Sequence, residues 1–285
     1  MPYLSLHVAD WVDKVVDWLV TKYDAAFDTL KAPLVTFMDA LEAALQALPP
    51  EVILIGLALL AWYLAGKKVA VMSAAGLWVL YAMGLWRETM TTLALVLVAT
   101  ALAVGIGIPL GILTAQNHRV EQVVRPLLDF MQTMPSFVYL IPVLMLFGIG
   151  KVPAVFATLI FAMPPAVRLT SLGIRQVPTE VVEAAKAFGS SRWQLLAKVQ
   201  FPIALPTVMT GVNQSIMLAL SMAVISAMIG AGGLGGVVYA AISRVEVGKG
   251  FAGGIGIVVL ALILDRVTQG IAGRSAVKKS STAWG

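Results

Sequence analysis

Long apolar runs separated by short polar stretches constrain this 285-residue chain more than any other feature of its sequence. The runs lie at about residues 52–66, 69–86, 89–115, 137–150, 153–172, 207–230 and 250–266. A water-soluble domain cannot bury that much apolar surface when 59% of its residues are hydrophobic and only 12% are charged. The sequence therefore predicts an all-α polytopic membrane protein whose solvent is the bilayer.

Several of these runs are shorter than the roughly 20 residues that a straight membrane span needs. The first two are separated only by Lys67-Lys68 and are short enough to form one hairpin. The fourth and fifth are interrupted by Pro135, Pro142, Pro153, Pro164 and Pro165. Proline at membrane depth is tolerated where neighbouring helices or a water-filled cavity satisfy the freed backbone groups. Such breaks suit a transport path, although simple kinks in a helix bundle give the same pattern.

The sequence contains no recognisable catalytic or metal-binding motif. There are no cysteines, and His7 and His118 are far apart in sequence. Gly150-Lys151 and Gly248-Lys249 lack the upstream glycine of a phosphate-binding loop. We therefore expect no enzyme activity, no metal and no cofactor on this chain, so any ATP and Mg²⁺ belong to a partner. The net charge of +5 indicates basic cytoplasmic loops rather than nucleic-acid binding.

The first 50 residues are predicted to be an amphipathic helical segment without a cleavable signal peptide. Its acidic residues recur at helical spacing, at Asp10, Asp13, Asp17, Asp24 and Asp28, with Trp11, Val15, Trp18, Leu19 and Phe27 between them. Prolines predict a break near Pro33 and an end at Pro49-Pro50. An interfacial helix with aromatic residues at headgroup depth and a soluble helical tail both fit this pattern.

A polar island at 183–202 interrupts the apolar runs and is predicted to form two short helices joined by a turn. We expect Thr179 to be the N-cap of the first helix and Gly189 its left-handed stop. Ser191 and Gln194 have the spacing of a capping box, and Pro202 is expected to end the second helix. Small alanines give the first helix a face that another protein can approach closely.

The residue order in this island resembles the EAA loop of ABC-importer permeases. The matching positions are Glu183, Ala184, Ala185, Gly189 and Pro202, and the departures Val199 and Phe201 from the usual Ile-x-Leu-Pro ending are conservative. The resemblance implies that loop 176–203 is cytoplasmic and that these five residues couple the chain to an ATPase subunit. An ordinary cytoplasmic hairpin that only connects two spans is the alternative.

Three further stretches extend the resemblance. Residues 125–150 (RPLLDFMQTMPSFVYLIPVLMLFGIG), 211–235 (GVNQSIMLALSMAVISAMIGAGGLG) and 263–269 (ILDRVTQ) are similar to the permease of glycine betaine/proline and choline ABC importers. The resemblance implies a five-helix type I importer core with two additional N-terminal transmembrane helices. The expected division is 1–50 for the amphipathic segment, 51–87 for the additional spans, 88–270 for the core and 271–285 for a cytoplasmic tail.

Charge asymmetry indicates the orientation in a bacterial cytoplasmic (inner) membrane. With the 183–202 island inside, seven spans place the N-terminus outside and the C-terminus in the cytoplasm. This arrangement puts 13 of the 20 basic residues inside, against 5 of the 15 acidic ones. Because cytoplasmic loops of membrane proteins are enriched in Lys and Arg, the count agrees with the placement of the island.

The run at 207–230 carries the most polar interior, and we expect some of its polar residues to line a substrate path. The candidates are Asn213, Gln214, Ser215 and Ser221, with hydrogen bonding between helices as the alternative for each. Phe137 and Tyr139 offer aromatic faces to a quaternary ammonium, unless they only pack. Asp265 and Arg266 are expected to mark the cytoplasmic edge of the last span. The glycine-rich segment 230–236 is open to three interpretations: a gate, a close helix approach or a turn.

The resemblance implies the membrane subunit of an ATP-driven importer for glycine betaine, proline betaine, proline or choline. Its expected partners are a second copy of itself, two ATPase subunits, a periplasmic or tethered substrate-binding protein and the lipid bilayer. An ion-driven secondary transporter or channel is the alternative, and a membrane scaffold without transport is a third class. An inverted repeat or an ionisable residue in the middle of a span would favour the ion-driven alternative, and the sequence shows neither.

Overall fold

The computed structural model describes residues 8–282, apart from the side chains of residues 8, 9, 12, 24, 26 and 272–282. Several predictions fall outside this range. They concern His7, the side chain of Asp24 and the side chains of the predicted cytoplasmic tail beyond Ile271. Within the described part, the secondary structure is helical with no strand, which confirms the all-α prediction.

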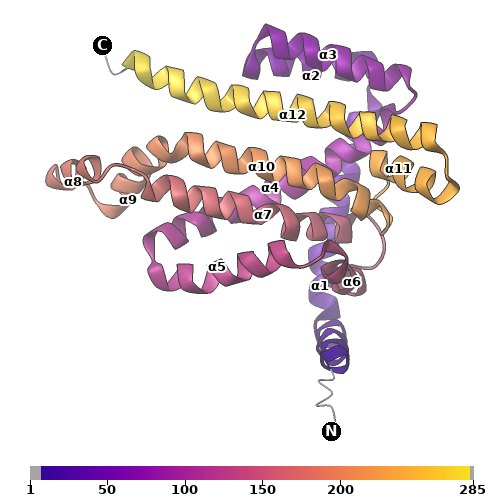
Figure 1. Ribbon diagram of the computed structural model, residues 1–285, viewed down its shortest axis with the longest axis horizontal. Coiled ribbons are helices and arrows are strands. Elements are labelled where there is room, and N and C mark those ends of the chain that lie inside the picture. The colour runs from indigo at the N-terminus through magenta and orange to yellow at the C-terminus, as the bar shows by residue number, and fades with distance from the viewer. Residues whose placement is uncertain (1–7, 283–285) are drawn as a thin grey trace.

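The helices follow one another along the chain with short connections. They are α1 (Val8–Ala47), α2 (Pro50–Ala65), α3 (Lys67–Ala82), α4 (Trp86–Gln116), α5 (His118–Thr133), α6 (Ser136–Phe147), α7 (Lys151–Arg175), α8 (Thr179–Ala187), α9 (Arg192–Gln194), the π-helix η1 (Leu195–Gln200), α10 (Phe201–Ala227), α11 (Gly233–Arg244) and α12 (Val247–Thr282). Helix α7 packs against both α4 and α10, and in Figure 1 α12 separates α10 from the α2–α3 hairpin. The C-terminal end of α12 and the α8–α9 loop lie at the same end of the bundle.

Small residues allow the central helices to approach closely. Gly107 and Gly111 of α4 face Ala166 and Thr170 of α7. A Cβ atom built on Gly111 would lie only 2.7 Å from the carbonyl oxygen of Val167, closer than real contacts allow. Because apolar lipid gives helices no hydrophobic reason to associate, such glycine contacts supply much of the packing between membrane helices.

Four segments in the described part are long and apolar enough to cross a membrane: α4, α7, Arg192–Ala227 and Val247–Ile271. The number rises to six if two bent pairs each count as one span, Phe27–Ala47 with α2 (bent by 105°) and α5 with α6 (bent by 101°). Alone, α2 and α3 have 16 residues each and α6 has 12. The count of seven spans therefore stays a prediction.

The prolines of the fourth and fifth runs differ in their effects. Pro135 is the N-cap of α6 and stands at the sharp bend after α5. Pro153 lies in the first turn of α7, where a helix needs no N–H donor. Pro142, Pro164 and Pro165 lie inside continuous helices. The expected interruption is therefore confirmed at Pro135 and wrong at the other four positions.

Helix α1 continues through Pro33, so the predicted break there is wrong. The non-helical residue is Tyr23, with φ −118° and ψ 16°. Beyond it, the segment up to Ala47 is held against the bundle by Met38, which is buried in the core, and by ion pairs from Lys151 to Asp39 and Glu42. These contacts outweigh the hydrogen bond that the proline removes. The end of α1 before Pro49 is as predicted.

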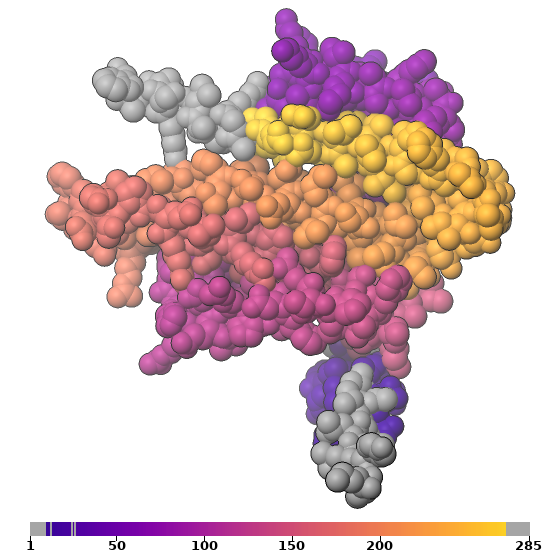
Figure 2. Space-filling view, in the orientation of Figure 1, coloured from indigo at the N-terminus to yellow at the C-terminus, as the bar shows by residue number. Residues whose placement is uncertain are grey.

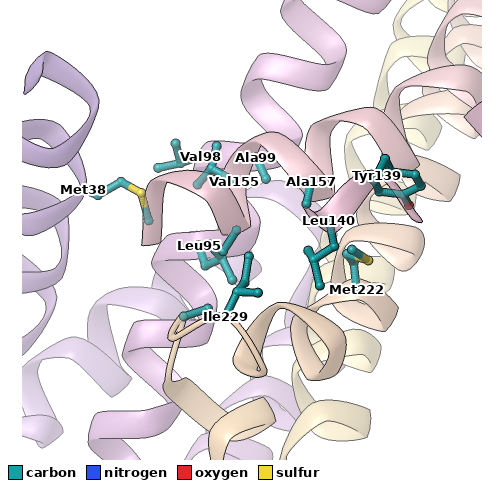
Figure 3. Close-up of a cluster of buried hydrophobic side chains, with 12 residues drawn as sticks. Met38, Leu95, Val98, Ala99, Tyr139, Leu140, Val155, Ala157, Met222 and Ile229 are labelled. Carbon is teal, nitrogen blue, oxygen red and sulfur yellow. The ribbon is translucent and has the colours of Figure 1, made fainter. Parts of the chain in front are cut away.

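The docked half of α1 contributes to a buried hydrophobic cluster at the centre of the bundle. Figure 3 shows Met38 extending from α1 toward Val98 of α4 and Val155 of α7. Leu140 of α6 and Met222 of α10 belong to the same cluster. The half of α1 before Tyr23 projects from the bundle (Figures 1 and 2) and exposes Trp11, Val15 and Trp18.

The glycine-rich segment between α10 and α11 forms a turn that packs closely on α4. Gly230, Gly232 and Gly233 have φ values of 90°, 71° and 68°, which side chains of L-residues rarely adopt. A Cβ atom on Gly233 would collide with the hydroxyl of Thr92, which accepts a hydrogen bond of 2.8 Å from the backbone N–H of Leu234. Of the three interpretations, a close approach and a turn both hold here.

Candidate coupling loop and translocation path

The first helix of the polar island begins one residue earlier than expected. Pro178 is the N-cap of α8, and Thr179 is the first helical residue, so the prediction of Thr179 as N-cap is wrong. Pro178 already has the extended backbone of a cap, with φ −54° and ψ 134°, and lets Thr179 take helical angles. No side chain caps the first turn of α8, in which Glu180 lies.

The turn after α8 is built as predicted around Gly189. This residue has φ +78°, and a left-handed glycine of this kind ends helices. The N–H of Gly189 donates to the carbonyl of Lys186 at 2.9 Å, and the N–H of Ser190 donates to the carbonyl of Ala185 at 3.1 Å. These two bonds form a Schellman motif, which reverses the chain without further support.

The second helix of the island starts with the predicted capping box. The N–H of Gln194 donates to Oγ of Ser191 at 3.3 Å, and the N–H of Ser191 donates to Oε1 of Gln194 at 2.9 Å. The helix does not end at Pro202, so that prediction is wrong. It continues through η1 into α10, because Pro202 lies in the first turn of α10, where proline is tolerated.

The loop from α8 to α9 exposes a surface that the bundle does not cover. Figure 2 shows this segment projecting from one end of the molecule, where α8 packs on η1. Glu183 and Ala184 are exposed and Ala185 is half-buried. Two large aromatic residues that the sequence analysis did not select lie at the tip: Phe188, which is 91% exposed, and Trp193, which is 73% exposed.

Exposed aromatic residues in an otherwise polar loop indicate an interface, because Trp and other aromatic side chains are common binding anchors. In the sequence, the only sign of this interface was the presence of two large aromatic residues within the charged segment 183–202. Pro202, the last of the predicted coupling residues, is half-buried at the base of α10. The predicted residues thus lie along one continuous loop and helix junction.

The polar candidates of α10 point in different directions. Gln214 and Ser221 are exposed, on the same helix face as Thr210 and Met217. Ser215 is fully buried and its hydroxyl has no hydrogen-bond partner within the described residues. Asn213 is half-buried and faces α12. Burial favours helix packing for Asn213 and Ser215, whereas Gln214 and Ser221 remain open to a ligand or a second chain.

The two aromatic candidates of α6 also differ in exposure. Phe137 is 51% exposed, whereas Tyr139 is buried in the hydrophobic cluster of Figure 3. The hydroxyl of Tyr139 has no hydrogen-bond partner there. Exposure therefore leaves the face of Phe137 available for a cation, while the ring of Tyr139 is packed within the subunit.

A polar network within the bundle joins α10 to α12 around Asp265. Oδ1 of Asp265 accepts hydrogen bonds of 2.8 Å from Nδ2 of Asn213 and Nε2 of Gln269. Oγ1 of Thr268 donates to Oδ1 of Asn213 at 2.7 Å. Asp265 lies inside the apolar segment Val247–Ile271, and α12 continues to Thr282. It therefore joins α10 to α12, and its predicted position at the cytoplasmic edge of the last span stays a prediction.

Comparison with known proteins identifies the architecture. In a solved structure of inward-facing MetNI methionine ABC transporter, one chain superposes with a TM-score of 0.59 at 21% sequence identity. The match covers 65% of this chain and 93% of that chain, and it shows the fold. The class that this fold defines is therefore that of the membrane-embedded chains with the ABC-importer permease fold.

Sequence comparison gives the family. A model of the binding-protein-dependent transport system inner membrane component family matches residues 107–276, and this chain belongs to that family. It is 47% identical to the glycine betaine/proline betaine transport system permease protein ProW of Escherichia coli, over 96% of this chain and 77% of ProW. The glycine betaine transport system permease protein OpuAB of Bacillus subtilis is 44% identical, over 96% of both chains.

A third relative is the glycine betaine/carnitine transport permease protein GbuB of Listeria monocytogenes, which is 49% identical over 93% of this chain and 95% of GbuB. Together these matches confirm the resemblance to ABC-importer permeases. In the part of the chain that the structure describes, no three His, Asp or Glu residues stand together as a metal site would require.

Proposed function

We propose that this chain is the transmembrane subunit of an ATP-driven importer for quaternary-ammonium or related compatible solutes. Glycine betaine is the solute named in all three relatives described above, and proline betaine, proline and choline belong to the same proposed range. The single observation that carries the proposal is the exposed α8–α9 loop, whose apolar tip has no partner within the described chain.

In this proposal the loop lies in the cytoplasm and binds a groove on an ATPase subunit. Phe188 and Trp193 anchor the contact, while Glu183, Ala184, Ala185, Gly189 and Pro202 shape the helix pair that presents them. Two copies of the chain with two ATPase subunits form the transporter, and a periplasmic or tethered binding protein delivers the solute. The N-terminus is then outside and the C-terminus is in the cytoplasm, at the same end as the loop.

The proposed path runs along the exposed face of α10, between the two copies. Gln214 and Ser221 are polar and uncovered on a helix that is otherwise apolar, and a polar residue facing lipid would be costly. Covering this face with a second copy removes that cost and creates a polar lining. Phe137 of α6 is the remaining aromatic candidate for contact with a quaternary ammonium.

Reconstitution into proteoliposomes tests the proposed function. Uptake of labelled glycine betaine should require both the ATPase subunit and ATP, and should not follow an ion gradient alone. Gradient-driven uptake without the ATPase would support the ion-driven alternative instead. Glu183→Ala should leave ATP hydrolysis measurable while uptake falls, because the loop transmits the movement between the two subunits.

Gly189 allows a sharper test of the coupling loop. A side chain there meets no other atom within 4 Å, so only the backbone conformation limits substitution. Gly189→Val should uncouple ATP hydrolysis from uptake, because a β-branched residue strongly disfavours φ +78°. Gly189→Asn is the matched control, since Asn tolerates the left-handed conformation. Equal uptake by all three proteins would contradict the coupling role.

The absence of cysteine from the sequence permits a direct test of the path. Gln214→Cys and Ser221→Cys should react with a water-soluble maleimide in the reconstituted transporter. Ser215→Cys, which is buried within the subunit, is the control that should not react. Unreactive cysteines at both exposed positions would place this face against lipid and would remove the proposed path.

A further inference from the structure

A charged cavity opens between α4, α5 and α7, near the end of the bundle that carries α8. Its volume is about 410 Å³, and its charged lining consists of Glu121, Arg125, Asp129, Arg168 and Arg175. Helix α5 is amphipathic, and its charged residues Arg125 and Asp129 are exposed and line this cavity.

Four of the five charges form two ion pairs between α5 and α7. Arg175 holds Glu121 through two parallel hydrogen bonds of 2.9 and 2.8 Å, and it also donates to the carbonyl of Thr114 at 2.6 Å. Arg168 pairs with Oδ1 of Asp129 at 2.5 Å. These pairs hold α5 against α7 and occupy both oxygens of Glu121, but they engage only one oxygen of Asp129.

The fifth charge, Arg125, makes no hydrogen bond or ion pair with any described residue, although it lines the same cavity. Asp129 follows it by one helical turn on α5, and its Oδ2 atom is not engaged by Arg168. An unpaired guanidinium therefore lies one turn from an available carboxylate oxygen. Between them the cavity wall is apolar, with Val124 and Leu128 on the same helix.

We propose that this cavity binds a small zwitterion that carries a carboxylate and a methylated ammonium group. The inference rests on the proposed function, because this is the chemistry of glycine betaine. Arg125 matches the carboxylate, since a guanidinium binds carboxylates through two parallel hydrogen bonds. Asp129 faces the ammonium, and Val124 and Leu128 contact its methyl groups.

The mixture of charges selects against simpler ions. Because the two ion pairs neutralise one another, a plain anion finds only Arg125 and a plain cation finds only the free oxygen of Asp129. A molecule with both charges meets a favourable partner at each end. Under the proposed orientation the cavity lies in the cytoplasmic half, so it receives solute on the side where transport ends.

Equilibrium binding of labelled glycine betaine to the full-length chain in nanodiscs, without a binding protein, tests this site. Arg125→Ala should weaken binding by about tenfold or more, the loss expected for a hydrogen-bonded charge pair, and Arg125→Lys should restore part of it. Arg119→Ala is the matched control, because this exposed arginine of α5 does not line the cavity. Choline and acetate, which each carry half of the zwitterion, should compete at least about tenfold more weakly.

Equal binding by Arg125→Ala and Arg119→Ala would overturn the site, and so would competition by choline as strong as that by unlabelled glycine betaine. Uptake by the wild type in proteoliposomes is measured in parallel. Failure of ATP-dependent uptake would contradict the proposed function. The comparison of Arg125→Ala with Arg119→Ala would still show whether glycine betaine binds in the cavity. Normal uptake with binding that does not depend on Arg125 would remove the cavity alone.

Discussion

Removing the carboxylate of Asp265 should loosen the contact between α10 and α12. The variant Asp265→Ala deletes the acceptor for Nδ2 of Asn213, which is half-buried and then loses its partner for this donor. Hydrogen bonds between membrane helices contribute about 0.6 kcal/mol on average and up to about 1.7 kcal/mol. Because Asp265 accepts from both Asn213 and Gln269, we expect the upper part of that range, about 1–2 kcal/mol.

A double-mutant cycle isolates this interaction. The free energy of unfolding would be measured in mixed micelles for Asp265→Ala, Asn213→Ala and the double variant. Asn213→Ala should lower the free energy of unfolding less in the Asp265→Ala background than in the wild type, by about 1 kcal/mol or more. Gln269→Ala is the control, since Gln269 is exposed and its loss should cost under about 0.5 kcal/mol. If the two single changes add within about 0.3–0.5 kcal/mol, the network does not hold the helices together.

Three further changes test the packing and the loop. Gly111→Leu should destabilise the protein by about 1–3 kcal/mol, measured as a lower Tm. Gly105→Leu on the same helix should not, because a Cβ atom there would meet no atom of another element within 4 Å. Lys151→Met leaves the carboxylate of Glu42 unpaired and should speed limited proteolysis of α1; an unchanged cleavage rate would show that the ion pairs are dispensable. Trp193→Ala should weaken binding of the ATPase subunit at least about tenfold in a pull-down titration, with an unchanged Tm, because the side chain is 73% exposed.

In the α8–α9 loop, the turn and the helix cap were the features that the sequence predicted best. The stop at Gly189 and the capping box of Ser191 and Gln194 depend on hydrogen bonds within a few residues, so their spacing predicted them correctly. Pro33 and Pro202 misled for a different reason. A proline breaks a helix only where no other interaction holds the helix together. Helix α1 is held by contacts with residues far away in the sequence, and η1 continues into α10, and neither could be predicted from the residues around the prolines.

The path candidates show a second limit. Asn213, Gln214 and Ser215 are neighbours in sequence, but successive residues of a helix point about 100° apart. One therefore meets α12, one is uncovered and one is buried. Composition identified a polar segment, yet only the positions of α7 and α12 decide which of the three side chains remains free.

The uninterrupted segment from Arg192 to Ala227 has a mechanical consequence. Its 36 residues run from α9 through η1 into α10 without a break, so its length is about 50 Å at 1.5 Å per residue. Such a rod acts as a lever: a tilt of about 5° at the α9 end displaces the other end by about 4 Å. Under the proposed coupling, a push on the protruding loop is carried to the other end of α10, where the chain turns into the glycine-rich segment that packs against α4.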